Sequence, residues 1–360
     1  EILRCLVGSE MCIRDRFQTD VMDFRRGSLD VRYCHRLQES IVLPGITDDY
    51  KIGYKSPYRH LDRLTRVYEY MGPAWYQREI EIPAAWKGKR IFLYFERTHW
   101  LSSVYVGKEE VSKIDYISIP HNHELTQWLH PGKKELITFC IDNRYQYDTH
   151  KWDHAHSEFT QINWNGVLGE IKLVAVDPVY VDDMQVYPDI KNKSIKVKMT
   201  VRNCTEHTAS GKISFHVSGK DYRLQKEVPV TVTDSITYIE EEMFLSKDIH
   251  LWNEFHPNLY TLDCKLTSSV EGQSYAHEKS TTFGMREVEA GEDHIILNGE
   301  PIHLRGTVEN AVFPKTGYAP VDDASWERVL RILKEYGMNH MRFHSWCPPC
   351  LLYTSPSPRD

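Results

Sequence analysis

The sequence predicts a multidomain, mostly β chain in which two successive β-sandwiches are followed by the opening of a β/α repeat. Short apolar runs with frequent turn residues fill residues 29–287, which is typical of sandwiches. Val176-Asp177-Pro178 resembles a joint that divides this region in two. A helical apolar period appears only after Gly284. A length of 360 residues agrees with two or three domains.

The two ends of the chain are expected to be artefacts. Codons for residues 11–15 and the reverse complement of codons for residues 351–354 can be one DNA sequence, which resembles a sequencing-library adaptor. We therefore leave residues 1–16 and 350–360 out of the fold predictions. A native signal peptide, if one existed, would be lost with the native N-terminus.

Residues 17–178 are expected to form a jelly-roll sandwich. Ile91, Leu93 and Phe95 alternate with two other aromatic residues, and residues 136–141 form another short apolar run. Turn signals recur at residues 44–45, 72–73, 87–88 and 131–132. Many short strands separated by such turns are typical of a sandwich or jelly roll.

Residues 179–287 are expected to form an immunoglobulin-like sandwich, because they hold about seven strands. These include residues 195–201, 213–217, 228–232 and 259–266. Cys204 and Cys264 lie in this part, but their phases differ. Cys204 is out of phase with the apolar positions of its strand, whereas Cys264 is in phase with Leu262 and Leu266. One side chain should point out and the other in, which argues against a disulfide.

Residues 288–349 are expected to begin a (β/α)₈ barrel. Residues 302–306 are predicted to be a short buried strand, and residues 339–343 a second one. Between them, Trp326, Val329, Leu330 and Leu333 have helical spacing, which predicts a helix over about 324–336. Asp322 or Asp323 can cap its start, and Gly337 suits its end. Strand, helix and strand in this order open a β/α repeat.

Composition excludes several classes of function. The net charge of −7 gives no basic footprint for nucleic acid or an anionic membrane, and no apolar run approaches the roughly 18 residues of a membrane span. The cysteines outside the ends show no CxxC spacing, so a zinc site or redox motif is not expected. His154-Ala155-His156 beside Asp153 could bind a metal, but surface histidines are the better interpretation. We expect no metal and no cofactor. The sequence leaves the oligomeric state open, and a periplasmic or extracellular location is preferred over the cytoplasm.

Four stretches are more specific than the element order. They are Gly72-Pro73-Ala74-Trp75-Tyr76 with Ile82-Pro83 and Trp86-Lys87-Gly88-Lys89, Asn163-Trp164-Asn165-Gly166, Leu251-Trp252 with His256-Pro257-Asn258-Leu259-Tyr260, and Phe283-Gly284-Met285-Arg286 with Leu297-Asn298-Gly299-Glu300-Pro301. In this order and at these separations they resemble the motifs of glycoside hydrolase family 2. The resemblance covers residues 40–349.

The resemblance implies a retaining β-glycosidase that hydrolyses terminal β-linked sugars by double displacement. It is β-galactosidase-like, with β-glucuronidase and β-mannosidase as alternatives. Such chemistry needs two carboxyl groups about 5–5.5 Å apart. In the family these are glutamates late in barrel strands four and seven, and this chain is expected to end near strand two. We therefore expect no catalytic residue in the chain and no activity from it alone.

Substrate-binding residues are implied at the C-terminal end of the second barrel strand, where sites on this barrel form. Arg342 matches the family pattern and would support the sugar or the nucleophile, since a nearby positive charge keeps a carboxylate ionised. A salt bridge within the barrel is the alternative. His344, one residue from its usual position, and Trp346 lie just beyond, where loop packing and roofing of the barrel are the alternatives.

One departure from the family puts galactose in doubt. After the first barrel strand, β-galactosidases often carry arginine, histidine and glutamate where this chain has Glu309, Asn310 and Ala311. Glu309 lies on the wrong strand to be the catalytic carboxylate. The rival class is a non-catalytic, lectin-like protein of two sandwiches, and a third is a purely structural scaffold. The predicted helix between two buried strands argues against the lectin.

Overall fold

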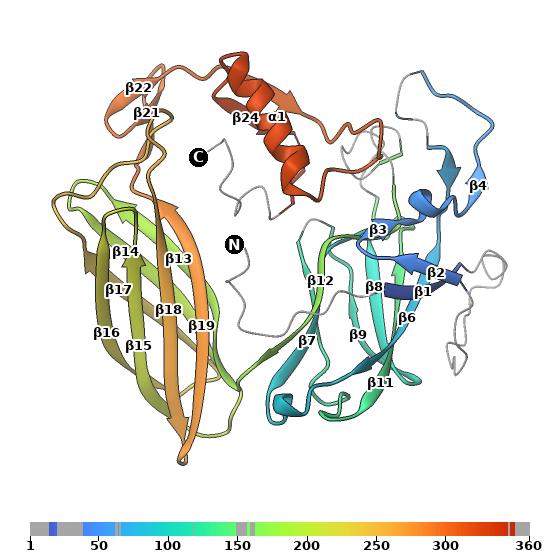
Figure 1. Ribbon diagram of the computed structural model, residues 1–360, viewed down its shortest axis with the longest axis horizontal. Helices are drawn as coiled ribbons and strands as arrows, with labels where there is room; N and C mark the ends of the chain where they lie inside the picture. Colours follow the sequence, from blue (N-terminus) through green and yellow to red (C-terminus); the bar gives the residue numbers. More distant parts are fainter. Residues whose placement is uncertain are drawn as a thin grey trace.

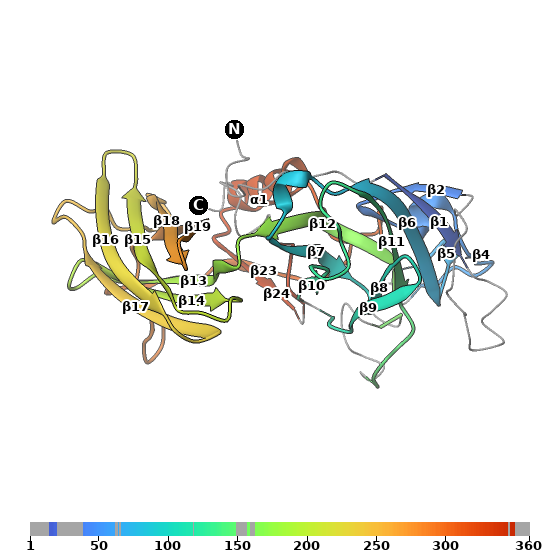
Figure 2. The ribbon, with the colours of Figure 1, turned by 90° about the horizontal axis from the view of Figure 1, so that it is seen from below.

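The computed structural model describes residues 14–19, 39–61, 64, 66–117, 119–148, 157–158, 163–344 and 346–349. Two β-sandwiches lie side by side, and a small unit with one helix lies beyond them near the ends of their strands (Figure 1). The view from below separates the two sandwiches clearly along the long axis (Figure 2). No helix in the described part is long and apolar enough to cross a bilayer.

The first sandwich consists of two antiparallel sheets. The larger has the order β2 (Glu39–Val42), β1 (Arg14–Thr19), β6 (Pro73–Glu81), β11 (Lys134–Asp142), β8 (Leu101–Val106) and β9 (Glu109–Ile114). The smaller has the order β10 (His121–Glu124), β7 (Arg90–Thr98), β12 (Gly166–Val176) and β3 (Gly45–Ile46). A hairpin of β4 (Tyr54–Lys55) and β5 (Tyr68–Glu69) and two 3-10 turns, Thr47–Tyr50 and Ala84–Trp86, complete it.

Alternation in the sequence fixes which face of each strand is buried. Ile91, Leu93 and Phe95 of β7 are buried in the core between the two sheets. β1 pairs with β2 and β6 and includes residues 14–16, which the sequence analysis assigned to an artefactual end. The boundary drawn at residue 16 therefore remains a prediction.

The second sandwich packs a three-stranded sheet on a four-stranded sheet. The first has the order β13 (Val179–Asp189), β14 (Ser194–Asn203) and β17 (Ile236–Phe244). The second has the order β16 (Arg223–Val232), β15 (Ala209–Ser218), β18 (Leu259–Val270) and β19 (Gln273–Gly284). The strands predicted at residues 195–201, 213–217, 228–232 and 259–266 are confirmed within β14, β15, β16 and β18. The predicted joint at residues 176–178 begins at the last residue of β12 and ends just before β13.

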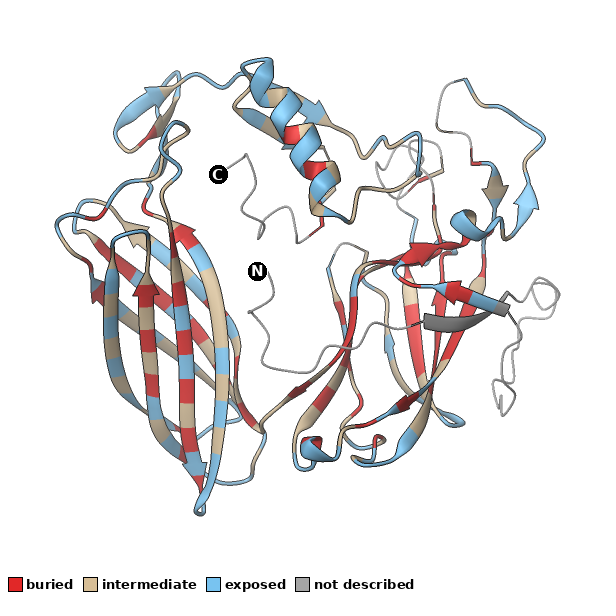
Figure 3. Cartoon of the chain, in the orientation of Figure 1, coloured by how far each residue is buried: buried red, intermediate tan, exposed pale blue. Residues whose placement is uncertain are grey.

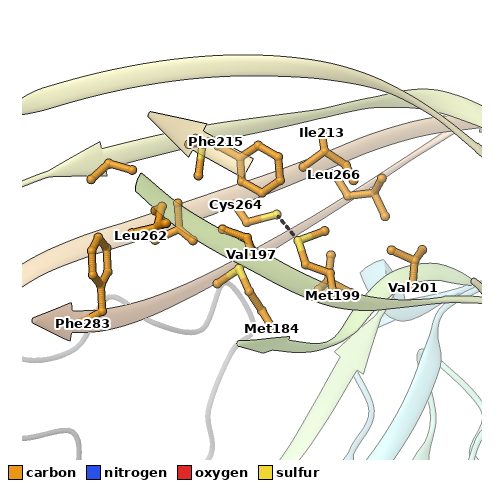
Figure 4. Close-up of a cluster of buried hydrophobic side chains, with 14 of the residues drawn as sticks. Met184, Val197, Met199, Val201, Ile213, Phe215, Leu262, Cys264, Leu266 and Phe283 are labelled. Atoms are coloured by element: carbon orange, nitrogen blue, oxygen red, sulfur yellow. Dashed lines mark hydrogen bonds between the residues drawn. The ribbon is translucent and has the colours of Figure 1, made fainter. Parts of the chain in front are cut away.

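The core of the second sandwich is separate from that of the first. Val197, Met199 and Val201 of one sheet face Phe215 and Cys264 of the other (Figure 4). The Cys264 sulfur lies 3.7 Å from the Met199 sulfur. Cys204 is exposed and Cys264 is buried, and both are free thiols, so the prediction that they form no disulfide is confirmed.

The C-terminal part holds a small antiparallel sheet and a parallel strand pair. The sheet consists of β20 (Val288–Ala290), β21 (Ile295–Leu297) and β22 (Glu300–Ile302). Asn298 and Gly299 both have positive φ, as a two-residue hairpin turn requires. β23 (Gly306–Glu309) then pairs in parallel with β24 (His340–Phe343), with α1 (Asp323–Glu335) between them in the chain.

The helix agrees with the sequence, but the first strand does not. The Asp322 side chain accepts a hydrogen bond from the Ser325 N–H and caps α1, and Trp326 and Leu330 are buried. The buried strand predicted at residues 302–306 is wrong, because β22 ends at Ile302, β23 begins at Gly306, and Leu304 is exposed. Ile302, the first residue of the predicted strand, pairs instead with Ile295 in the β21–β22 hairpin. Buried residues are dense in both sandwiches and sparse around α1 (Figure 3).

Candidate functional site

The carboxyl ends of β23 and β24 lie at one edge of the parallel pair. In its register Val308 lies beside Arg342, and Glu309 beside Phe343. Two N–H groups of the next segment bond to this edge. The Glu309 carbonyl accepts hydrogen bonds from the His344 backbone N–H at 2.8 Å and from the Trp346 indole N–H at 3.2 Å. The three predicted substrate-binding residues are therefore neighbours at one strand end.

Arg342 lies on the face of the pair that α1 does not cover. Met341 and Phe343 pack against the cluster around Trp326, and alternation along β24 turns Arg342 the other way. Arg342 is exposed, and Val308 beside it is 49% exposed. Arg342 takes part in none of the ion pairs among the described residues, so the salt bridge that the sequence left as an alternative is not found there.

Trp346 takes part in an aromatic cluster. Its ring centroid lies 5.4 Å from that of Phe343 at 85° and 6.0 Å from that of Phe313 at 77°, both edge-to-face arrangements. This packing matches the roofing alternative for Trp346. A sugar contact for Trp346 or His344 remains a prediction.

The Glu309 carboxylate is held by its own turn. It accepts hydrogen bonds from the N–H groups of Ala311 at 2.9 Å and Val312 at 3.3 Å. Burial is the main influence on this side chain and raises the pKa of its carboxyl above the usual range. The carboxylate therefore stabilises the turn that follows β23.

The first sandwich contacts this unit at two places that the sequence analysis missed. Tyr318 and Val321, which precede α1, pack against Ile46 and Leu168. Arg97 of β7 donates a hydrogen bond to the Pro348 carbonyl at 2.6 Å, across 251 positions of the chain. No local sequence pattern could link positions so far apart.

The second sandwich contacts the unit through two of the recognised motifs. Arg286 lies over the Trp252 ring, with its guanidinium carbon 4.4 Å from the ring centroid. The Asn298 amide donates to the Trp252 carbonyl at 2.9 Å, and the Asn339 amide donates to the Glu254 carboxylate at 2.5 Å. These contacts give the tryptophan and arginine of the motifs a physical role at the junction.

The described residues contain no group of three side chains suited to hold a metal ion. Asp153, His154 and His156, weighed as ligands from the sequence, lie outside the described residues.

Some solved structures of multidomain proteins have the same order of two sandwiches and a parallel strand–helix–strand unit. The putative β-galactosidase from Bacteroides fragilis superposes with a TM-score of 0.76 at 16% identity, covering 97% of this chain and 51% of that one. A family model described as glycosyl hydrolases family 2 matches residues 179–286. The chain is thus similar to glycosyl hydrolase family 2 proteins, and the family model itself covers the second sandwich.

Curated relatives agree with this family. The β-galactosidase of Thermoanaerobacter pseudethanolicus is 24% identical over 277 residues, covering 76% of this chain and 36% of that protein. The β-glucuronidase of Sus scrofa is 22% identical over 321 residues, covering 81% of this chain and 46% of that protein. The chain thus spans less than half the length of both relatives.

Proposed function

We propose that the chain is the N-terminal part of a retaining β-glycosidase that acts on terminal β-linked sugars, with a β-galactoside as the first choice of substrate. In this proposal residues 17–178 are a jelly-roll sugar-binding domain and residues 179–287 an immunoglobulin-like sandwich. Residues 288–349 begin the catalytic (β/α)₈ barrel, and the acid and nucleophile glutamates lie outside this sequence.

The single observation that carries the proposal is the parallel pairing of β23 with β24, with α1 packed on one face. A lectin of two sandwiches has no use for such a unit. A barrel keeps its helices outside and its strand interior facing the axis. Val308 and Arg342 would then face that axis, and Arg342 would lie at the substrate end.

Activity measurements on two proteins test the proposal. A longer protein encoded by the native gene should hydrolyse p-nitrophenyl β-D-galactoside, and a 2-deoxy-2-fluoro glycoside should leave a covalent adduct on one glutamate. The 360-residue chain, assayed beside it, should give no turnover above buffer. Turnover by this chain would contradict the proposal, as would a longer protein that binds sugars but cleaves no aryl β-glycoside.

A β-glucuronide is the second candidate substrate, because the relative from Sus scrofa is a β-glucuronidase. In addition, this chain has Glu309, Asn310 and Ala311 where β-galactosidases often carry arginine, histidine and glutamate. The same assay with p-nitrophenyl β-D-glucuronide separates the two. A ratio of kcat/KM that favours the glucuronide would reverse our first choice.

A further inference from the structure

The outward face of the sheet β13-β14-β17 carries an ordered grid of polar side chains. Strand register places Asp183, Thr200 and Tyr238 in one row across the three strands. The next row holds Gln185, Lys198 and Glu240. Because residues two apart in a strand share a face, both rows point away from the core that Met199 and Val201 fill.

These six residues, together with Met199 and Ile239, line a hollow of about 430 Å³, which we call the Tyr238 hollow. Thr200 is the shortest of the six side chains and lies on the middle strand, between Asp183 on one side and Tyr238 on the other. Asp183 and Tyr238 lie two strand spacings apart, about 10 Å, which leaves room for one pyranose ring between them.

One wall of the hollow is ordered by its own hydrogen bonds. The Tyr187 hydroxyl donates to the Gln185 carbonyl oxygen at 2.5 Å, and the Gln185 amide donates to the Asp183 carboxylate at 2.8 Å. Side chains that are already fixed by hydrogen bonds lose little conformational entropy when they bind a ligand hydroxyl.

The opposite wall combines charge with an exposed ring. Glu240 lies 3.2 Å from the Lys196 nitrogen and 3.6 Å from the Lys198 nitrogen, so its carboxylate is held in place. Tyr238 is 80% exposed, which leaves an aromatic face open to a partner. Aromatic rings offer an apolar face and a polar tip, and a sugar offers apolar C–H faces between its hydroxyls.

We propose that the Tyr238 hollow binds a neutral pyranose unit of an oligo- or polysaccharide, on a sheet different from the one that carries Arg342. The pyranose would lie over Thr200 and against the Tyr238 ring, with hydroxyls directed to Asp183, Gln185 and Glu240. Lys196 and Lys198 both pair with Glu240, and Asp183 adds a second carboxylate, so the hollow offers a uronate carboxylate repulsion and no lysine that is not already paired. This site does not depend on the proposed hydrolysis, because the described chain contains all of it.

Affinity electrophoresis of the 360-residue chain tests the proposal, with gels containing soluble β-1,4-galactan, β-1,4-mannan, β-1,4-xylan, mixed-linkage β-glucan or polygalacturonate. At least one neutral glycan should retard the chain, and polygalacturonate should not. Tyr238→Ala should weaken the retardation at least tenfold, and Thr200→Arg, which places a long side chain on the middle strand, should do the same. Circular dichroism should remain unchanged, because both changes are on the outer face.

Two control variants separate this site from others. Tyr336, beyond the end of α1, is 79% exposed, so Tyr336→Ala removes an equally open ring elsewhere and should leave retardation unchanged. Arg342→Ala should also leave the retardation unchanged. If the glycan bound at the ends of β23 and β24 instead, Arg342→Ala would abolish the retardation. The proposal is overturned if no neutral glycan retards the chain, if polygalacturonate does, or if Tyr238→Ala matches the unaltered chain.

Discussion

The guanidinium carbon of Arg286 lies 4.4 Å from the centre of the Trp252 ring, and the same ring blocks the space beside Gly284. A Cβ atom at position 284 would lie 2.9 Å from both Cβ and Cγ of Trp252. The tryptophan, glycine and arginine of two separate motifs are thus parts of one contact. It stands where the second sandwich ends and the C-terminal unit begins.

Gly284→Ala should lower the free energy of unfolding by about 1–3 kcal/mol, because the added methyl group overlaps the tryptophan. Urea unfolding followed by fluorescence measures this. The cost should shrink when Trp252→Gly is already present, since Cβ and the ring of Trp252 are then both gone. Equal costs in both backgrounds would show that the contact does not explain the glycine.

Arg66 is the buried centre of a charge network in the first sandwich. Its guanidinium contacts Asp48 at 2.8 Å and Glu158 at 3.0 Å, and donates to the Asn163 carbonyl at 2.7 Å. Arg66→Met should cost about 3–5 kcal/mol, because it leaves carboxylates without their partner. The control is Lys134→Met, which removes an exposed pair 3.9 Å from Glu79 and should change stability by at most about 1 kcal/mol. Similar effects of the two changes would refute this role.

Two buried histidines should make the first sandwich sensitive to acid. His121 and His123 share the Ser102 hydroxyl at 2.6 and 2.8 Å, and His123 also contacts the Ser112 hydroxyl at 2.8 Å. Burial lowers the pKa of both imidazoles from the usual 6.5, that of His123 to about 3. The unfolded chain therefore binds protons that the folded chain does not. Their stabilisation is complete above pH 6.5 and is lost as the pH falls from about 6.5 to about 3.

His123→Gln keeps hydrogen-bonding groups but removes the titration, so the loss of stability between pH 7 and pH 5 should decrease by on the order of 2 kcal/mol. Denaturant titrations at the two pH values measure this. His130→Gln, at an exposed histidine, serves as the control. An unchanged pH dependence in His123→Gln would rule out this account. His121 and His277, whose pKa values burial also lowers, that of His277 to about 4, contribute to the dependence that remains.

Asp322→Ala should weaken α1 by about 1 kcal/mol, because the Ser325 N–H loses its acceptor. Faster amide exchange within residues 326–333, with no change in β14 or β18, would report a local effect. Asp323→Ala, one position further on, leaves the cap bond intact and should have the smaller effect. The reverse order would show that the cap is misassigned.

The C-terminal unit should exchange its amides faster than the sandwiches. Only Trp326 and Leu330 of α1 are buried, while Leu304 and Val308 are exposed. Regions with few buried apolar contacts open at low free energy. Hydrogen exchange on the unaltered chain measures this, and uniform protection across residues 179–344 would contradict it.

Local patterns in the sequence determined several strands of each sandwich, the phase of Cys204 and Cys264, and α1 with its cap. Each follows from spacing within a dozen residues, where burial of one face decides the structure. The strand predicted at residues 302–306 failed, because a short apolar run carries no information on which neighbour it will pair with.

Only the tertiary structure decided the contacts between distant positions. The Arg97 bond to Pro348, the charges around Arg66 and the rows that form the Tyr238 hollow all depend on which strands become neighbours and in what register. A sequence records the chemistry of each side chain, but the pairing of strands is chosen by the free energy of the whole core. Those pairings set the distances on which both proposed sites depend.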